Sequence, residues 1–274
     1  MKTPNGSIGR LALYAHLAVA AATLPGSATA DETLLCNHHV VSLPYRITGP
    51  GHYCLARSLS TPANPAYTAA ITIDADSVLL DLNQFTLDGS AVGSATAMTG
   101  ILGLADHRHI TVRNGVVRGF FDGINLYGAG GGHTVEHIWA DHNYEAGIEV
   151  RSLGGRNLVR DNVVTDTGGS TNLNEFPGGV ANAFGISVNG SANVINNEVT
   201  HTFGMNGGIA WAFELVFEAE GQVAVNNRVI GADTLGFACG AGPTPVIVLR
   251  DNIVLGVATP YGPGCTKIGL TNFP

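Results

Sequence analysis

A group of polar residues in the middle of the chain has the side-chain types that carry out acid–base chemistry on carbohydrates. Glu149 and Glu218 are carboxylic acids, which act in pairs in glycoside hydrolysis. Arg151 would neutralise the carboxylate of a uronate sugar while Tyr127 or His142 removes the proton beside it, which is the chemistry of a polysaccharide lyase. We predict these five residues as catalytic, with both reaction types left open.

Alternation along extended segments predicts which polar residues share a face. Outward side chains of neighbouring parallel strands would lie about 4.8 Å apart and form a polar ladder. Carboxylates on that ladder would stand roughly 5–10 Å apart, a range that covers retaining and inverting glycosidases. Substrate-binding roles are predicted for Asn125, Asn189, Glu220 and Glu175. The expected outward pairs are Asn125 with Tyr127, Glu149 with Arg151, Ser187 with Asn189, and Glu218 with Glu220.

Two recurring markers show which elements must position these residues. An Asn-x-Val tripeptide, with His137-Ile138-Trp139 filling one gap, recurs at intervals of 23 to 35 residues. A Gly-Ile pair precedes it in phase, and the two longest intervals indicate insertions near 166–184 and 202–213. The Asn-x-Val tripeptides start at Asn114, Asn162, Asn197, Asn227 and Asn252, and the Gly-Ile pairs start at Gly100, Gly123, Gly147 and Gly185.

Short alternating segments without a helical period favour a solenoid of parallel strands. We therefore predict an all-β fold, a single-stranded right-handed parallel β-helix of about seven coils between Ile71 and Val254. Asn at the tight turns would form a hydrogen-bonded ladder, with His137 replacing it in one coil. A β-sandwich is the disfavoured alternative, because its turns would not recur in phase with both markers.

Several strings resemble the bacterial right-handed parallel β-helix repeat proteins of the pectin-lyase-like superfamily. They include Ile71-Thr72-Ile73-Asp74, Leu80-Asp81-Leu82-Asn83 and Thr111-Val112-Arg113-Asn114-Gly115. The segment from Ser42 to Leu55 resembles the cap of exported members. The resemblance implies a substrate groove along one sheet, walled by long turn insertions. The residue series typical of polygalacturonases and the clear calcium-binding Asp cluster of pectate lyases are absent from the sequence.

The N-terminal residues have the pattern of a signal peptide. Residues 11–24 are apolar, and Ala28-Thr29-Ala30 is a small-residue cleavage site. We expect a signal peptide at 1–30, a cap segment at 31–70 and the β-helix with a C-terminal cap at 71–274. The expected location is periplasmic or secreted, with no membrane association after cleavage.

Composition narrows the range of partners. The net charge is −8, and the two lysines are Lys2 and Lys267, so nucleic acid is not an expected partner. We expect a polysaccharide partner, with an acidic polymer as one candidate, and the oligomeric state stays open.

The four cysteines favour two disulfides, Cys36 with Cys54 and Cys239 with Cys265, each closing one end of the stack. Four cysteines allow three connectivities, so this pairing is a preference.

Metal chemistry is not assigned to any residue set. Calcium at Asp74, Asp76 and Asp81 stays open as an alternative, because calcium prefers hard oxygen ligands. Trp139 is expected in the core, with an aromatic platform for a sugar as the alternative.

The leading functional hypothesis is an exported β-helix that engages an extracellular polysaccharide and acts as a polyuronate lyase or a glycoside hydrolase. The alternative is a non-catalytic surface or scaffold protein that binds glycan or protein. On that alternative the ladder is only a solvated polar face, in which the pairing of Glu149 with Arg151 contributes little.

Overall fold

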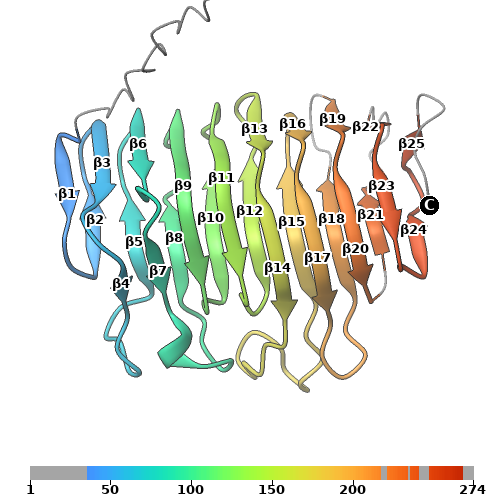
Figure 1. Cartoon of the computed structure of the whole chain (residues 1–274), viewed down its shortest axis with the longest axis horizontal. Coiled ribbons are helices and arrows are strands. Elements are labelled where there is room, and N and C mark those ends of the chain that lie inside the picture. The colour runs from blue at the N-terminus through green and yellow to red at the C-terminus, as the bar shows by residue number, and fades with distance from the viewer. Residues whose placement is uncertain (1–35, 217–220, 234, 241–246, 268–274) are drawn as a thin grey trace, which may run out of the picture. The chain divides into compact units, whose positions relative to one another are not determined.

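A computed structural model describes residues 36–216, 221–233, 235–240 and 247–267. It forms a parallel β-solenoid of about 8 turns, which confirms the predicted fold (Figure 1). Strands that are neighbours in a sheet are separated by roughly one coil in sequence, and every strand pair is parallel. The signal-peptide prediction for 1–30 lies outside the described residues.

The nine-stranded sheet, which we call sheet I, carries the Gly-Ile markers. Ile101, Ile124, Ile148 and Ile186 stand in register and are fully buried. The glycine before each leaves no room for a side chain: a Cβ at Gly123 would meet a carbonyl oxygen at 2.6 Å. Sheet I consists of β2 (Tyr45–Ile47), β5 (Ala69–Ile73), β8 (Thr99–Gly103), β10 (Asp122–Gly128), β12 (Ala146–Ser152), β15 (Ala183–Asn189), β18 (Ala210–Val216), β21 (Leu235–Cys239) and β24 (Thr259–Tyr261).

The sixteen-stranded sheet, sheet II, bends into two halves within each coil. Both halves send Val, Ile and Leu side chains inward against sheet I, because alternate residues of each strand face the core. Its first half comprises β1 (His38–Val40), β3 (Gly51–Leu55), β6 (Val78–Asp81), β9 (Ile110–Arg118), β11 (Thr134–Asp141), β13 (Asn157–Arg160), β16 (Ala192–Ile195), β19 (Gln222–Val225), β22 (Ile247–Arg250) and β25 (Thr266–Lys267). The second half comprises the ends of β9 and β11 with β4 (Leu59–Ser60), β7 (Thr86–Asp88), β14 (Val163–Gly168), β17 (Glu198–Phe203), β20 (Arg228–Ala232) and β23 (Ile253–Leu255).

A buried ladder of asparagines lies at the bend of sheet II. The side-chain amide of Asn162 donates to Asn197 at 2.9 Å, Asn197 to Asn227 at 3.0 Å, and Asn227 to Asn252 at 3.0 Å. Each amide nitrogen also donates to a backbone carbonyl in the preceding coil, as Asn227 does to Val194. The predicted ladder is therefore confirmed for these four residues.

The placement of His137 and Asn114 in that ladder is wrong. His137 is in register with Asn114 and Asp161, and these three residues form an outer column. The buried ladder column lies one residue later in each coil. Before Asn162, that column contains Gly115 and Ile138 in the two preceding coils. All three residues of the outer column have positive φ, between 53° and 58°, at an outer corner. Asn suits both positions, since it tolerates a left-handed backbone and its amide can form a ladder, so two different columns look alike in sequence.

The connections between sheet II and the next strand of sheet I carry the long loops, all along one edge of the stack (Figure 1). Residues 169–182 separate β14 from β15, and residues 204–209 separate β17 from β18. Both fall where insertions were predicted, within narrower bounds. The loop after β7 contains the short 3₁₀ helix η1 (Ser90–Val92).

Disulfides close both ends of the described stack. Cys36 pairs with Cys54 and Cys239 with Cys265, which confirms the predicted connectivity. Within the described ranges, no helix has the length and apolarity needed to cross a membrane.

Candidate functional site

The outer face of sheet I carries a row of polar side chains in consecutive coils. Asn125, Glu149, Ser187 and Glu214 are in register on β10, β12, β15 and β18. A second row, two residues further along, contains Tyr127, Arg151 and Asn189. The predicted outward pairs on the first three strands are therefore confirmed.

The fourth predicted pair is wrong as a ladder position. The partners of Ser187 and Asn189 on the next strand are Glu214 and Val216. Glu218 and Glu220 lie outside the described residues. The error follows from the second insertion, which ends at Ile209 and lets β18 begin earlier than the sequence pattern indicated.

Asn125 joins two buried carboxyl groups. Its amide nitrogen donates to Asp122 Oδ2 at 2.9 Å and to Glu149 Oε2 at 2.6 Å. The two oxygens are thus no further apart than these two hydrogen bonds laid end to end. Asp122 and Glu149 are only 6% and 5% exposed.

Glu145, directly before β12, adds a third carboxyl group. The charges of Asp122 and Glu149 raise the pKa of its carboxyl group, which places it near both. Neighbouring carboxyl groups repel each other when all of them are ionised. We call Asp122, Glu145 and Glu149 the carboxyl cluster.

Burial raises the pKa of every member of the carboxyl cluster. The pKa of Asp122 rises to about 6, because desolvation outweighs the hydrogen bond from Asn125. Desolvation and then the charges of Asp122 and Glu149 raise the pKa of Glu145 to about 8. Desolvation and then the charge of Asp122 raise the pKa of Glu149 to about 7. Near pH 7, Glu145 therefore holds a proton while Asp122 is mostly ionised, so one cluster contains both an acid and a base.

Arg151 borders the cluster on its exposed side. Its guanidinium lies 2.6 Å from Glu149 Oε1, and its charge favours ionised Asp122 and Glu149. Arg151 and Tyr127 are exposed, so solvent reaches both side chains directly beside the buried carboxyl groups. Asn189, beside Arg151, is half-buried, and Ser187 donates to Glu214 at 2.7 Å.

The first insertion lies against the cluster. Glu175 is exposed on it, and its charge raises the pKa of Asp122 and Glu145, which places it near both. The Phe176 ring packs against Phe121 with centroids 6.0 Å apart, next to Asp122 in sequence. The Thr171 amide donates to Ser94, so the insertion is also tied to the loop after β7. These contacts put Glu175 near the carboxyl cluster, and its role in substrate binding stays a prediction.

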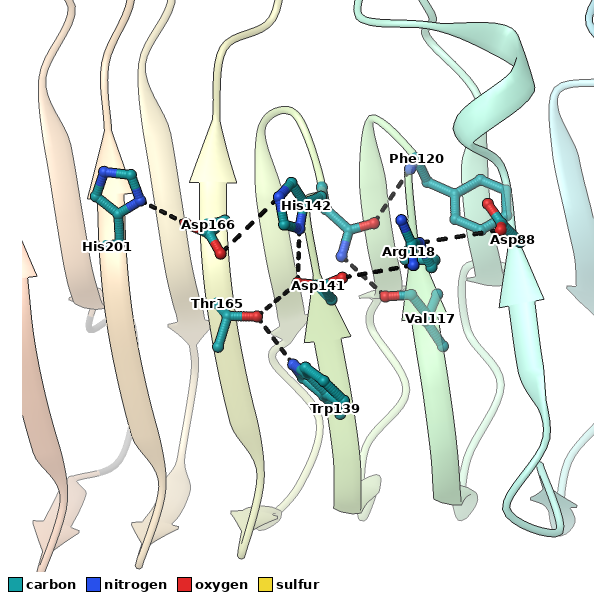
Figure 2. Close-up of polar contacts among 11 residues, drawn as sticks. Asp88, Val117, Arg118, Phe120, Trp139, Asp141, His142, Thr165, Asp166 and His201 are labelled. Carbon is teal, nitrogen blue, oxygen red and sulfur yellow. Dashed lines mark hydrogen bonds and ion pairs between the residues drawn. The ribbon is translucent and has the colours of Figure 1, made fainter.

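His142 belongs to a different set of residues. Its ring lies on sheet II, with Nδ1 2.7 Å from Asp141 Oδ1 and Nε2 3.9 Å from Asp166 Oδ2 (Figure 2). The prediction had grouped it with Glu149 and Arg151 as a catalytic residue. The chain turns from sheet II to sheet I between His142 and Glu145, and this turn separates the two side chains.

The acidic residues considered for calcium already have cationic neighbours. His107 Nε2 and Nδ1 lie 3.0 Å from Asp74 and Asp76, and Arg46 pairs with Asp74 at 2.5 Å. Asp81 lies apart from them and pairs with Arg113 at 2.8 Å.

Trp139 is not in the core, so that expectation is wrong. It is 48% exposed because its neighbours Ile138 and Ala140 take the inward positions of β11. Its indole N–H donates to Thr165 at 2.9 Å. Trp139 also lines a groove of about 480 Å³ along the bend of sheet II, together with His137 and Asp161.

Sequence reasoning missed Asp122 and Glu214 and gave Glu145 no role of its own. A usable signal was present: Asp122 and Glu145 stand one and two residues ahead of consecutive Gly-Ile markers. Since those markers begin strands of sheet I, an acid just ahead of each falls at the same edge of the sheet.

Comparison with known proteins returns no matching family model, no curated relative and no matching solved structure. The two disulfides indicate folding in a non-reducing environment.

Proposed function

We propose that this protein is an exported enzyme of the pectin-lyase-like superfamily that cleaves an extracellular polysaccharide by glycoside hydrolysis. The observation that carries the proposal is the carboxyl cluster, in which acids with unequal raised pKa values share the amide of Asn125. The disulfides support export, because they are stable outside a reducing cytoplasm.

Each member of the cluster has a role that follows from its protonation. Glu145, protonated near pH 7, donates its proton to the glycosidic oxygen of the leaving sugar. Glu149, held beside Asp122 by Asn125, supplies the ionised carboxylate that attacks the sugar carbon as the leaving oxygen takes the proton of Glu145. A water molecule that gives its proton to Glu145 then releases the sugar from Glu149. The positive charge of Arg151 favours the ionised form of Glu149 and so opposes the burial that raises the pKa of this carboxyl group.

The exposed rim supplies recognition. Arg151 and Tyr127 are reachable from solvent in the row beside the cluster, and Glu175 approaches from the insertion. A guanidinium favours an anionic sugar, so a polyuronate is the first substrate to test. Arg151 with Tyr127 also forms the pair that β-elimination would use, which keeps lyase products as an outcome of the same assay.

A second candidate function is non-catalytic glycan binding. It is favoured by the burial of Asp122 and Glu149, to which a substrate has limited access. The exposed Trp139 in its groove offers an aromatic platform on the other sheet, where a sugar ring could stack.

A panel of neutral polysaccharides and polyuronates tests both functions. New reducing ends without ultraviolet absorbance are expected, whereas unsaturated products would show β-elimination. Glu145→Gln and Glu149→Gln should each lower kcat by roughly 10²-fold or more, the usual contribution of an acid or base. Glu198→Gln is the matched control, because Glu198 is an outward glutamate on sheet II, 3.5 Å from Arg228.

The outcomes separate the candidates. Full activity in both cluster variants would overturn the assignment of the site. Absence of product with every polymer, combined with retained glycan binding that Trp139→Ala abolishes, would establish the binding function instead.

A further inference from the structure

Three consecutive coils place His142, Asp166 and His201 in one column on the outer edge of sheet II (Figure 2). Each has positive φ, between 50° and 55°. The same position in other coils is glycine: Gly119, Gly231 and Gly256 also have positive φ. Glycine adopts this backbone without strain. The fold therefore accepts glycine at this position. The backbone does not require the two histidines and the aspartate, so their side chains have another role.

Hydrogen bonds orient the side chains of His142 and Asp166, each through the ring nitrogen or carboxylate oxygen that faces away from the other residue. Asp141 Oδ1, which also accepts from the Thr165 hydroxyl at 2.7 Å, lies 2.7 Å from His142 Nδ1. His201 Nδ1 lies 2.5 Å from Asp166 Oδ1. These contacts occupy one donor or acceptor atom of each ring or carboxylate. They leave His142 Nε2 and Asp166 Oδ2 facing each other.

The gap between those two atoms is the unusual feature. His142 Nε2 and Asp166 Oδ2 are 3.9 Å apart, which is too long for a hydrogen bond. Zinc-like ions bind nitrogen and carboxylate oxygen at roughly 2.0–2.2 Å from each, so two ligand atoms of a tetrahedral ion lie about 3.4 Å apart. A small approach of these two exposed side chains would bring them to that separation. Potential ligand atoms of Asp141, His142 and Asp166 all lie within 4.8 Å of one another.

We propose that His142 Nε2 and Asp166 Oδ2 bind a divalent transition-metal ion, with Asp141 and His201 as positioning residues. A metal-bound histidine typically donates its other ring N–H to a carboxylate, which is the arrangement of His142 with Asp141. Arg118 lies 4.0 Å from Asp141 Oδ2, and its positive charge keeps that oxygen from being a ligand. Water completes the coordination, since His142 and His201 are 60% and 63% exposed.

The ligand chemistry selects the class of ion. Imidazole nitrogen with carboxylate oxygen suits zinc, copper, nickel or iron, whereas calcium and magnesium prefer oxygen alone. Arg118, which lies 4.0 Å from Asp141, also lies 3.9 Å from Asp88.

Zinc titration of the disulfide-bonded protein tests the proposal by calorimetry and tryptophan emission. One of the two tryptophans, Trp139, is connected to the site through Thr165 and Asp141, so zinc should change its emission. One equivalent of Zn²⁺ should bind in preference to Ca²⁺ and Mg²⁺. His142→Gly should abolish binding without unfolding the protein, because glycine fits this backbone in neighbouring coils. Asp141→Asn and His201→Gly should weaken binding roughly 10–100-fold, as expected for groups that orient a ligand.

His137→Gly is the matched control, since His137 is another exposed histidine with positive φ, on β11, the strand that ends one residue before His142. It should leave the zinc affinity unchanged. Three results would overturn the proposal: no saturable zinc binding, equal affinity in His142→Gly and the unsubstituted protein, or preference for calcium.

Discussion

Glu145 shows how one side chain makes the stability of the fold depend on pH. Its pKa is raised to about 8 by burial and by the charges of Asp122 and Glu149. At a pH below the ordinary glutamate pKa, Glu145 holds its proton in both the folded and the unfolded chain. The full contribution of the protonated side chain to the free energy of unfolding is then present. As the pH rises towards 8, the unfolded chain loses the proton first and stability falls.

We therefore predict that Glu145→Gln flattens the pH dependence of unfolding. The unsubstituted protein should lose on the order of 2–4 kcal/mol between pH 5 and pH 9 from this group, at about 1.4 kcal/mol per unit of pKa shift. Glutamine remains uncharged, so the variant should be relatively more stable at high pH. Urea unfolding at several pH values measures this, with Glu198→Gln as control, and an unchanged slope would contradict it.

Part of the candidate site could be predicted from the sequence at this scale. The period of two placed Asn125, Glu149 and Arg151 on one outer face, because alternation is a property of the strand itself. The raised pKa of Glu145 could not be predicted, since it depends on Asp122 from the preceding coil and on burial. Trp139 was misplaced because a large apolar residue was taken as core although both its neighbours face inward.

At the scale of elements, the bend in sheet II depends on the asparagine ladder. The four rungs satisfy backbone and side-chain groups inside the bend, where water does not reach them. The sequence predicted that an asparagine ladder exists, because the motif repeats. It did not predict the exact ladder position in every coil. The outer corner with a left-handed backbone and the inner ladder position are one residue apart, and both favour Asn. The insertions were predictable from the longer intervals, whereas the start of β18 was not, since a loop has no period.

Asn227→Ala should be strongly destabilising. Its side-chain oxygen accepts from the Asn197 backbone and amide at 2.9 and 3.0 Å, and its amide donates to Val194 at 2.9 Å. Each buried group left without a partner costs roughly 1–3 kcal/mol, so we expect a loss of at least about 3 kcal/mol. Chemical denaturation measures it. Asn193→Ala is the control, as Asn193 is exposed on β16, and equal losses in both variants would show that the ladder adds nothing.

At the scale of the whole molecule, a solenoid has few contacts between distant coils. Strands pair with the next coil along, so each coil is stabilised by its neighbours, and a terminal coil has only one. The fold was predictable from sequence because two markers recur in phase through the chain. The terminal coils are also the places where the disulfides lie, Cys36 with Cys54 and Cys239 with Cys265.

Replacing Cys239 and Cys265 together by alanine should loosen the stack from one end. The bond closes a loop with a sequence separation of 26, and loops of this size contribute about 3–4 kcal/mol by restricting the unfolded chain. Because stability passes from neighbour to neighbour, hydrogen exchange should accelerate first in β21, β22 and β24 and leave β10 and β12 protected. The Cys36 and Cys54 double variant should show the opposite polarity, with β1 and β3 exchanging first. Uniform acceleration along the stack in either variant would show that the coils unfold as one cooperative unit, with the disulfides stabilising all of them alike.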